Sequence, residues 1–122
     1  MAVLYDPIIQ KVLVQKLKIA RNFWDRTVGL LGRKSIGENE GLLIFQCASI
    51  HTFFMRFAID VVFIESNMVV KKIVHKIRPW RIAMCKGAFY ALELPAGKAE
   101  QLGIYVGQVL AFSELDENPV GE

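Results

Sequence analysis

Cysteine is scarce in this 122-residue sequence, which holds only Cys47 and Cys85. Two cysteines outside any Cys-x-x-Cys pair are too few for the disulfide scaffold of a small secreted domain. We therefore expect two buried free thiols in a reducing compartment, with a single bridge as the alternative.

Long hydrophobic runs are absent as well. The longest uncharged stretch, residues 41–55, is interrupted by Gln46, His51 and Thr52 and is shorter than the roughly 20 apolar residues of a membrane-spanning helix. The N-terminus has no basic head before an apolar core, since Asp6 and Pro7 interrupt it. For the chain as given, these features predict no membrane span, no secretory signal and a cytoplasmic location.

Signatures of common chemistries are also missing. The sequence has no Walker loop, no Rossmann glycine pattern and no nucleophile elbow. It has no aromatic strand motif of the RNA-binding type and no helix-turn-helix. The function therefore has to be argued from less specific features.

What is present is a hydrophobic content of 53%, which predicts one folded domain over residues 1–122 and excludes a disordered chain. We place the core at about residues 12–112 and expect a flexible acidic tail at 114–122. Residues 66–92 carry six basic side chains and no acid. A basic face can attract an anionic partner, and an ordinary solvated strand face is the alternative.

Alternation and turn signals predict a series of short strands. Residues 12–20 alternate like a half-buried strand, and residues 23–31 suit a short helix. The runs 53–64 and 68–77 flank a turn at Ser66-Asn67 and predict a β-hairpin. Further strands are expected at 41–46, 88–94 and 106–112, with a helical turn at 98–102. This series predicts a mainly β fold at the border of α+β, an antiparallel sandwich or barrel with one or two short helices.

Two charges interrupt the apolar run 53–64, namely Arg56 and Asp60. If the whole run is one strand, both side chains lie on one face, roughly 13 Å apart, which is too far for direct pairing. An isolated buried charge costs several kcal/mol. We interpret the pair either as part of an exposed or structural polar face, or as an anion-facing Arg56 beside a concave surface.

The segment Arg78-Pro79-Trp80-Arg81 follows the predicted hairpin. Two guanidinium groups beside an indole can stack on and neutralise a ligand that carries phosphate or carboxylate. The alternative is that these residues seal one end of the fold, with Trp80 buried and the arginines reaching out to solvent.

Cys47 and His51 stand four residues apart, a spacing that permits a thiolate nucleophile or two metal ligands. No further Cys or His is close in sequence, so His75 and Cys85 would have to approach through the fold. We predict a structural histidine, no metal site and no cofactor.

Five segments together resemble the motifs of one family. They are RTVGLLGR at 26–33, EGLLIF at 40–45, SIHTFFMRFAIDVVFI at 49–64, LELPAG at 92–97 and GIYVGQ at 103–108. In this order they make the chain similar to the domain of unknown function 192 family. The resemblance implies a small jelly-roll-like sandwich or barrel and no particular activity. The chain departs from the family pattern in three respects: Ala58 replaces a proline, Arg56-Phe57 replaces Lys-Asn, and Gln108 replaces the aspartate of a closing Gly-Asp.

We favour a non-enzymatic binding module for a small anionic ligand. Its predicted site consists of Arg56, Asp60, Arg78, Trp80 and Arg81. One alternative is an adaptor whose sheet edge pairs with a partner protein. Another is a hydrolase or transferase that uses Cys47 with His51. The modest net charge of +3 and the acidic tail argue against a nucleic-acid partner.

Overall fold

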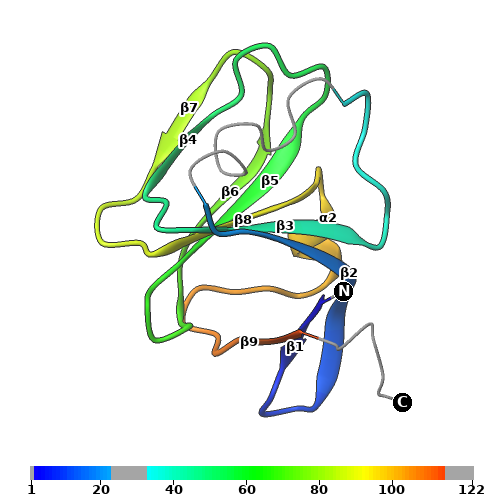
Figure 1. Ribbon diagram of the computed structural model, residues 1–122, viewed down its shortest axis with the longest axis vertical. Coiled ribbons are helices and arrows are strands. Elements are labelled where there is room, and N and C mark those ends of the chain that lie inside the picture. Colours follow the sequence, from blue (N-terminus) through cyan, green and yellow to red (C-terminus); the bar gives the residue numbers. More distant parts are fainter. Residues whose placement is uncertain (1, 23–32, 115–122) are drawn as a thin grey trace.

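The computed structural model of the chain describes residues 2–22 and 33–114, and strands are its main elements (Figure 1). They are β1 (Ala2–Asp6), β2 (Lys11–Ala20), β3 (Glu40–Phe45), β4 (Ser49–His51), β5 (Ile59–Ile64), β6 (Val70–Ile77), β7 (Ile82–Met84), β8 (Tyr90–Pro95) and β9 (Ala111–Glu114), with the short helix α2 (Lys98–Gln101). Seven strands form one sheet in the order β6-β5-β8-β3-β2-β1-β9, and β4 pairs with β7 separately. The prediction of a mainly β fold is confirmed.

The larger sheet is open and mixed. Its outer strands are β6 and β9, so it does not close into a barrel. β2 and β3 run parallel, with Lys16 opposite Glu40 and Ala20 opposite Ile44. The predicted antiparallel arrangement therefore does not hold for this pair. Parallel neighbours need a long connection, and the helix predicted at 23–31 falls in that connection, outside the described residues.

The core lies on both faces of the central strands. Every residue of β5 and β8 is buried. One face holds Leu43, Leu92 and Val62 in a cross-strand row, and the other buries Phe63 and Ala91. Strands covered on both faces have largely apolar sequences, which explains why a strand was predicted at each of these two places.

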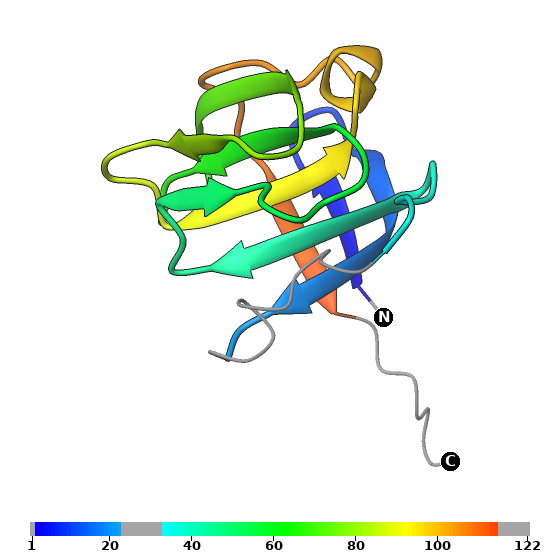
Figure 2. The same ribbon diagram turned by 90° about the horizontal axis from the view of Figure 1, so that it is seen from above.

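The sheet bends at β2. This strand pairs with β1 from Lys11 to Leu17 and with β3 from Lys16 to Ala20. Figure 2 shows that β1 and β9 cross β3 and β8 at a steep angle. β1 also pairs with β9, so Ala2 lies opposite Glu114 and the first and last described strands are neighbours.

Several boundaries differ from the sequence prediction. The run 53–64 is a strand only from Ile59 onward, because residues 52–58 form a loop after β4. Arg56 therefore does not share a strand with Asp60, and the expected common face is wrong. The strand expected at 106–112 is β9, which is shorter and begins later. The short strands β1, β4 and β7 were not predicted.

Gln108, one of the departures from the family pattern, has a structural partner. Its Nε2 donates to Asp6 Oδ2 at 2.8 Å, and its Oε1 accepts from the Tyr105 amide at 3.2 Å. Asp6 Oδ1 accepts from the amides of Ile8 and Ile9 at the β1–β2 turn. The Gln108 hydrogen bond, helped by these two amides, lowers the pKa of Asp6. The side-chain amide of Gln108 therefore stabilises the ionised carboxylate of Asp6, whereas an aspartate at position 108 would repel it.

The one helix among the described residues is too short to span a bilayer. α2 has four residues, and nothing helical in residues 2–22 or 33–114 has the length and hydropathy needed to cross a bilayer.

Candidate functional site

Two loops meet at Thr52, whose side chain is fully buried. Its Oγ1 donates to the Arg78 carbonyl at 2.6 Å and accepts from the Arg81 amide at 2.9 Å. Its backbone amide donates to the Arg81 carbonyl, and its carbonyl accepts from the amides of Trp80 and Met55. Thr52 thus fastens the loop 78–81 against the loop 52–58.

Four rings gather where these loops meet, and we call them the aromatic cluster: His51, Phe53, Phe54 and Trp80. His51 stacks on Phe53 with ring centroids 4.8 Å apart, and Phe53 stacks on Trp80 at 5.8 Å. Phe54 contacts Trp80 at 4.6 Å. Phe54 is 70% exposed and Trp80 is 55% exposed. A clustered, exposed aromatic surface is typical of binding sites. The alternative of a buried Trp80 is wrong.

The backbone under Phe54 and Trp80 is strained. Phe54 has φ 67° and Trp80 has φ 66°, both in the left-handed region. This region costs an ordinary residue roughly 1–2 kcal/mol. Such strain persists only where surrounding contacts impose it, and the hydrogen bonds of Thr52 are those contacts. The fold therefore presents Phe54 and Trp80 to solvent at an energetic cost.

The predicted arginines lie in the same two loops. Arg56, Arg78 and Arg81 are exposed. Arg81 Nη1 donates to the carbonyls of Pro79 and Trp80 at 3.4 and 3.3 Å, which folds it over its own loop. The guanidinium groups of Arg56 and Arg78 make no hydrogen bond or ion pair with any described residue. They are free to receive an anion.

Asp60 lies elsewhere, in the core at the start of β5. It is fully buried. Its Oδ1 accepts from the amides of Lys76 at 2.8 Å and Gly97 at 3.0 Å, and its Oδ2 accepts from the Ala99 amide at 2.9 Å. Lys76, with φ 51°, lies where the β5–β6 register shifts, and the Gly97 and Ala99 amides lie at the start of α2. Asp60 thus joins a β-bulge to a helix start, and we leave it out of the ligand site.

Cys47 and His51 have separate partners. Cys47 Sγ donates to the Ser49 carbonyl at 3.1 Å, whereas His51 Nδ1 accepts from the Phe53 amide at 3.2 Å. Neither Cys47 nor Cys85 forms a disulfide. Within the part of the chain that the structure describes, no group of three potential metal ligands comes together.

Sequence reasoning missed a second buried carboxylate, Glu93, in the middle of β8. It lies between Leu42 of β3 and Val61 of β5 and is 5% exposed. No described residue donates a hydrogen bond to its carboxyl group. Burial raises the pKa of Glu93 to about 7. One glutamate in an otherwise apolar strand is the only signal in the sequence, and that signal does not distinguish a buried acid from an exposed one.

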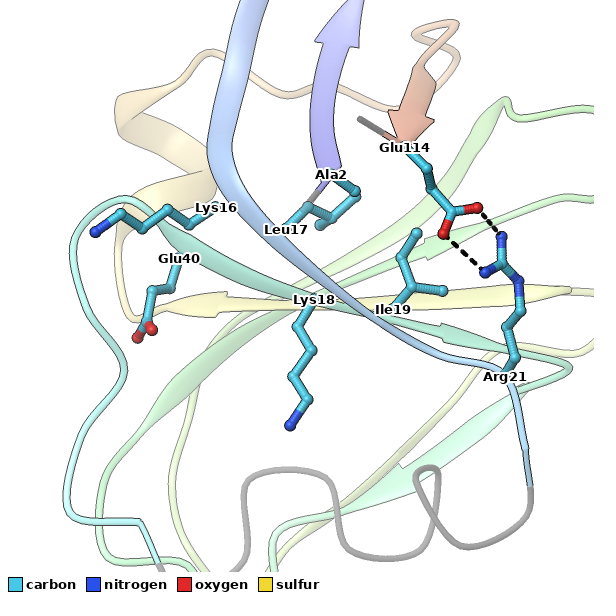
Figure 3. A pocket seen from close by; sticks show the side chains of 8 residues that line it. All are labelled: Ala2, Lys16, Leu17, Lys18, Ile19, Arg21, Glu40 and Glu114. Carbon is cyan, nitrogen blue, oxygen red and sulfur yellow. Dashed lines mark hydrogen bonds and ion pairs between the residues drawn. The ribbon is translucent and has the colours of Figure 1, made fainter. Parts of the chain in front are cut away.

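A cavity of about 420 Å³ runs along β2, away from the predicted site residues (Figure 3). It is lined by Ala2, Lys16, Leu17, Lys18, Ile19, Arg21, Glu40 and Glu114. Only the general basic character of this segment was visible in the sequence.

Known proteins match the chain over most of its length. The family model of domain of unknown function 192, described as "Uncharacterized ACR", matches residues 8–112. A UPF0127 protein of Pyrococcus furiosus is 36% identical over 108 residues, which are 82% of this chain and 89% of that protein. A UPF0127 protein of Thermococcus sibiricus is 33% identical over 114 residues, 88% of this chain and 72% of that protein.

Two crystal structures share the fold. A protein of unknown function from Novosphingobium aromaticivorans has a TM-score of 0.78 and 20% identity, and the match covers 90% of this chain and 82% of the other. A candidate transcription regulator from Sinorhizobium meliloti has a TM-score of 0.78 and 21% identity over 91% of each chain. At this level of identity the likeness supports the fold alone.

Proposed function

Since the chain belongs to the uncharacterised domain of unknown function 192 family, we propose a function from its own surface. The protein is a non-enzymatic module that binds a small anionic ligand with a planar ring at the aromatic cluster. Arg56, Arg78 and Arg81 supply the positive charge, and Trp80 with Phe54 supplies the stacking surface.

The observation that carries this proposal is the strained and exposed pair Phe54–Trp80. Hydrophobic side chains at left-handed backbone positions are costly, and burial does not offset the cost here because both rings face solvent. Stacking a ligand ring on an aromatic side chain contributes about 0.5–1.5 kcal/mol beyond area burial. The protein therefore holds the rings of Phe54 and Trp80 in place before a ligand with a flat ring binds.

Charge around the aromatic cluster supports an anion in particular. The sequence from residue 46 to residue 92 contains two acids, Asp60 and Glu65. Asp60 is buried and hydrogen-bonded, and Glu65 follows the far end of β5. Hydrogen bonds between guanidinium groups and phosphate or carboxylate are among the stronger ones in proteins.

Fluorescence of Trp80 tests the proposal. The chain has two tryptophans, so Trp24→Phe leaves Trp80 as the only one. We expect phenyl phosphate to change its emission at lower concentration than inorganic phosphate or phenol, because only phenyl phosphate combines ring and charge. Arg78→Ala in this background should weaken binding about tenfold, or 1.4 kcal/mol.

The matched control is Lys86→Ala, which removes one positive charge outside the aromatic cluster. Its affinity for phenyl phosphate should equal that of the parent. The proposal fails if phenyl phosphate leaves the emission unchanged, or if the Lys86 and Arg78 variants lose affinity equally.

A protein partner is the second candidate, and β7 favours it. Ile82 and Met84 are 61% and 60% exposed and lie on one face of this strand, next in sequence to the loop of Trp80. Exposed apolar side chains on a two-stranded sheet suit an adaptor surface. If this surface pairs with a second copy, sedimentation will show a dimer that Ile82→Ser and Met84→Ser together convert to monomer. A monomer at every concentration would count against self-association.

A further inference from the structure

The cavity along β2 continues into a smaller one of about 50 Å³, and we call the two together the β2 trough. They share Lys16, Lys18 and Glu40 in their linings. The smaller part adds Arg33, Ile36, Gly41 and Leu42. The volume of the larger part lies in the range of small-molecule pockets.

The trough exists because β2 extends beyond the end of β1. β1 pairs with β2 only as far as Leu17, which lies opposite Ala2. On the other side of β2, the pairing with β3 continues to Ala20. Within the described ranges, no strand pairs with β2 beyond Leu17 on the β1 side. Figure 3 shows Arg21 reaching from the end of β2 toward Glu114 across this gap.

Arginines already neutralise both carboxylates of the trough. Arg21 donates to both oxygens of Glu114, at 2.9 and 2.5 Å, and this lowers the pKa of Glu114. Arg33 donates to Glu40 Oε1 at 2.8 Å. The Gly37 amide and then Arg33 lower the pKa of Glu40. Both acids are therefore ionised and engaged at neutral pH.

Lys16 and Lys18 have no such partner. Neither ammonium group makes an ion pair or a hydrogen bond with the residues that the structure describes. Both side chains are exposed. Lys16 does lie opposite Glu40 and helps to lower the pKa of that carboxyl, but without an ion pair. The trough thus offers two ammonium groups that are open to a bound anion.

The two amines suit two separate anionic groups. Lys16 and Lys18 are alternate residues of one strand, so their Cα atoms are about 7 Å apart. Figure 3 shows their amines pointing to different sides of the trough. The apolar side chains of Leu17 and Ile19 also line it. We infer that the β2 trough binds an organic dianion, with carboxylate or phosphate groups on Lys16 and Lys18 and an apolar linker between them.

Amide chemical shifts of the 15N-labelled full chain test this inference. Suberate is the probe, and octanoate has the same length with one carboxylate. We expect suberate to shift the amides of residues 16–21 and 41–42, with at least fivefold higher affinity than octanoate. Equal affinity for the two acids, or shifts that lie elsewhere, would overturn the inference.

Paired variants separate the site from general charge. Lys16→Gln with Lys18→Gln should weaken suberate binding at least tenfold, whereas Lys71→Gln with Lys86→Gln removes the same charge elsewhere and should leave it unchanged. All four lysines are exposed, so both variants should keep the parent spectrum away from the changes. Equal losses in the two variants would show a nonspecific charge effect and overturn the inference.

Discussion

Asp60→Ala is expected to lower the free energy of unfolding by about 4 kcal/mol, a large share of the roughly 5–15 kcal/mol of a typical domain. The carboxylate accepts three amide hydrogen bonds. Alanine leaves all three donors without an acceptor in a fully buried place, and no water replaces the carboxylate unless the core opens. Urea denaturation at pH 7 measures the effect.

Asp60→Asn and Glu65→Ala are the comparison variants for this prediction. Asparagine keeps one oxygen acceptor, so its loss should be intermediate. Glu65 lies outside the core and has no side-chain partner among the described residues, so its replacement should change stability by less than about 0.5 kcal/mol. A loss below about 1 kcal/mol for Asp60→Ala would contradict the structural role.

Glu93→Gln is expected to stabilise the protein, and the gain depends on pH. In the folded protein the pKa of Glu93 is about 7, against 4.5 for an ordinary glutamate. The folded state therefore holds a proton that the unfolded state releases between these two values. Wild-type stability falls as pH rises through this window, and above pH 7 the full cost is about 3 kcal/mol. Glutamine never ionises and avoids that cost.

Urea denaturation at pH 4.5 and pH 8 measures this difference. The variant and the wild type should differ by less than about 0.5 kcal/mol at pH 4.5, where the carboxyl is neutral in the folded protein and only half ionised in the unfolded chain. At pH 8 the variant should be the more stable by about 3 kcal/mol. Glu65→Gln controls for the general loss of a charge and should show no such pH dependence. A difference that is the same at both pH values would refute the ionisation of a buried Glu93.

The strands that could be predicted are those whose sequence reflects burial. β2 alternates, β5 and β8 are apolar apart from one acid each, and Ser66-Asn67 marks the β5–β6 turn. The loop 52–58 could not be predicted because its sequence is as apolar as a strand. It leaves the strand conformation because Thr52 bonds to residues 78–81, and no local pattern encodes a contact between segments so far apart.

The candidate site could be predicted only in part, because some of its residues come together only through the fold. Arg78, Trp80 and Arg81 are adjacent in sequence, so their grouping was visible. Phe54 was not predicted as a site residue. Its φ is positive and its side chain is exposed, but the sequence alone does not distinguish such a phenylalanine from one in the core. The partners of Asp60 are backbone amides of Lys76, Gly97 and Ala99. The sequence does not show which backbone amides donate to a side chain, so the structural role of Asp60 could not be predicted.

The pairing of β1 with β9 places a constraint on biosynthesis. Ala2 lies opposite Glu114, so β1 has to wait for a partner strand that is synthesised much later. During translation β1 can pair with β2, but its other edge stays bare until β9 leaves the ribosome. Contacts this distant in sequence slow folding, and an unpaired edge is a template for aggregation. The free edge of β1 is therefore open to other chains for the whole interval between the synthesis of β1 and that of β9.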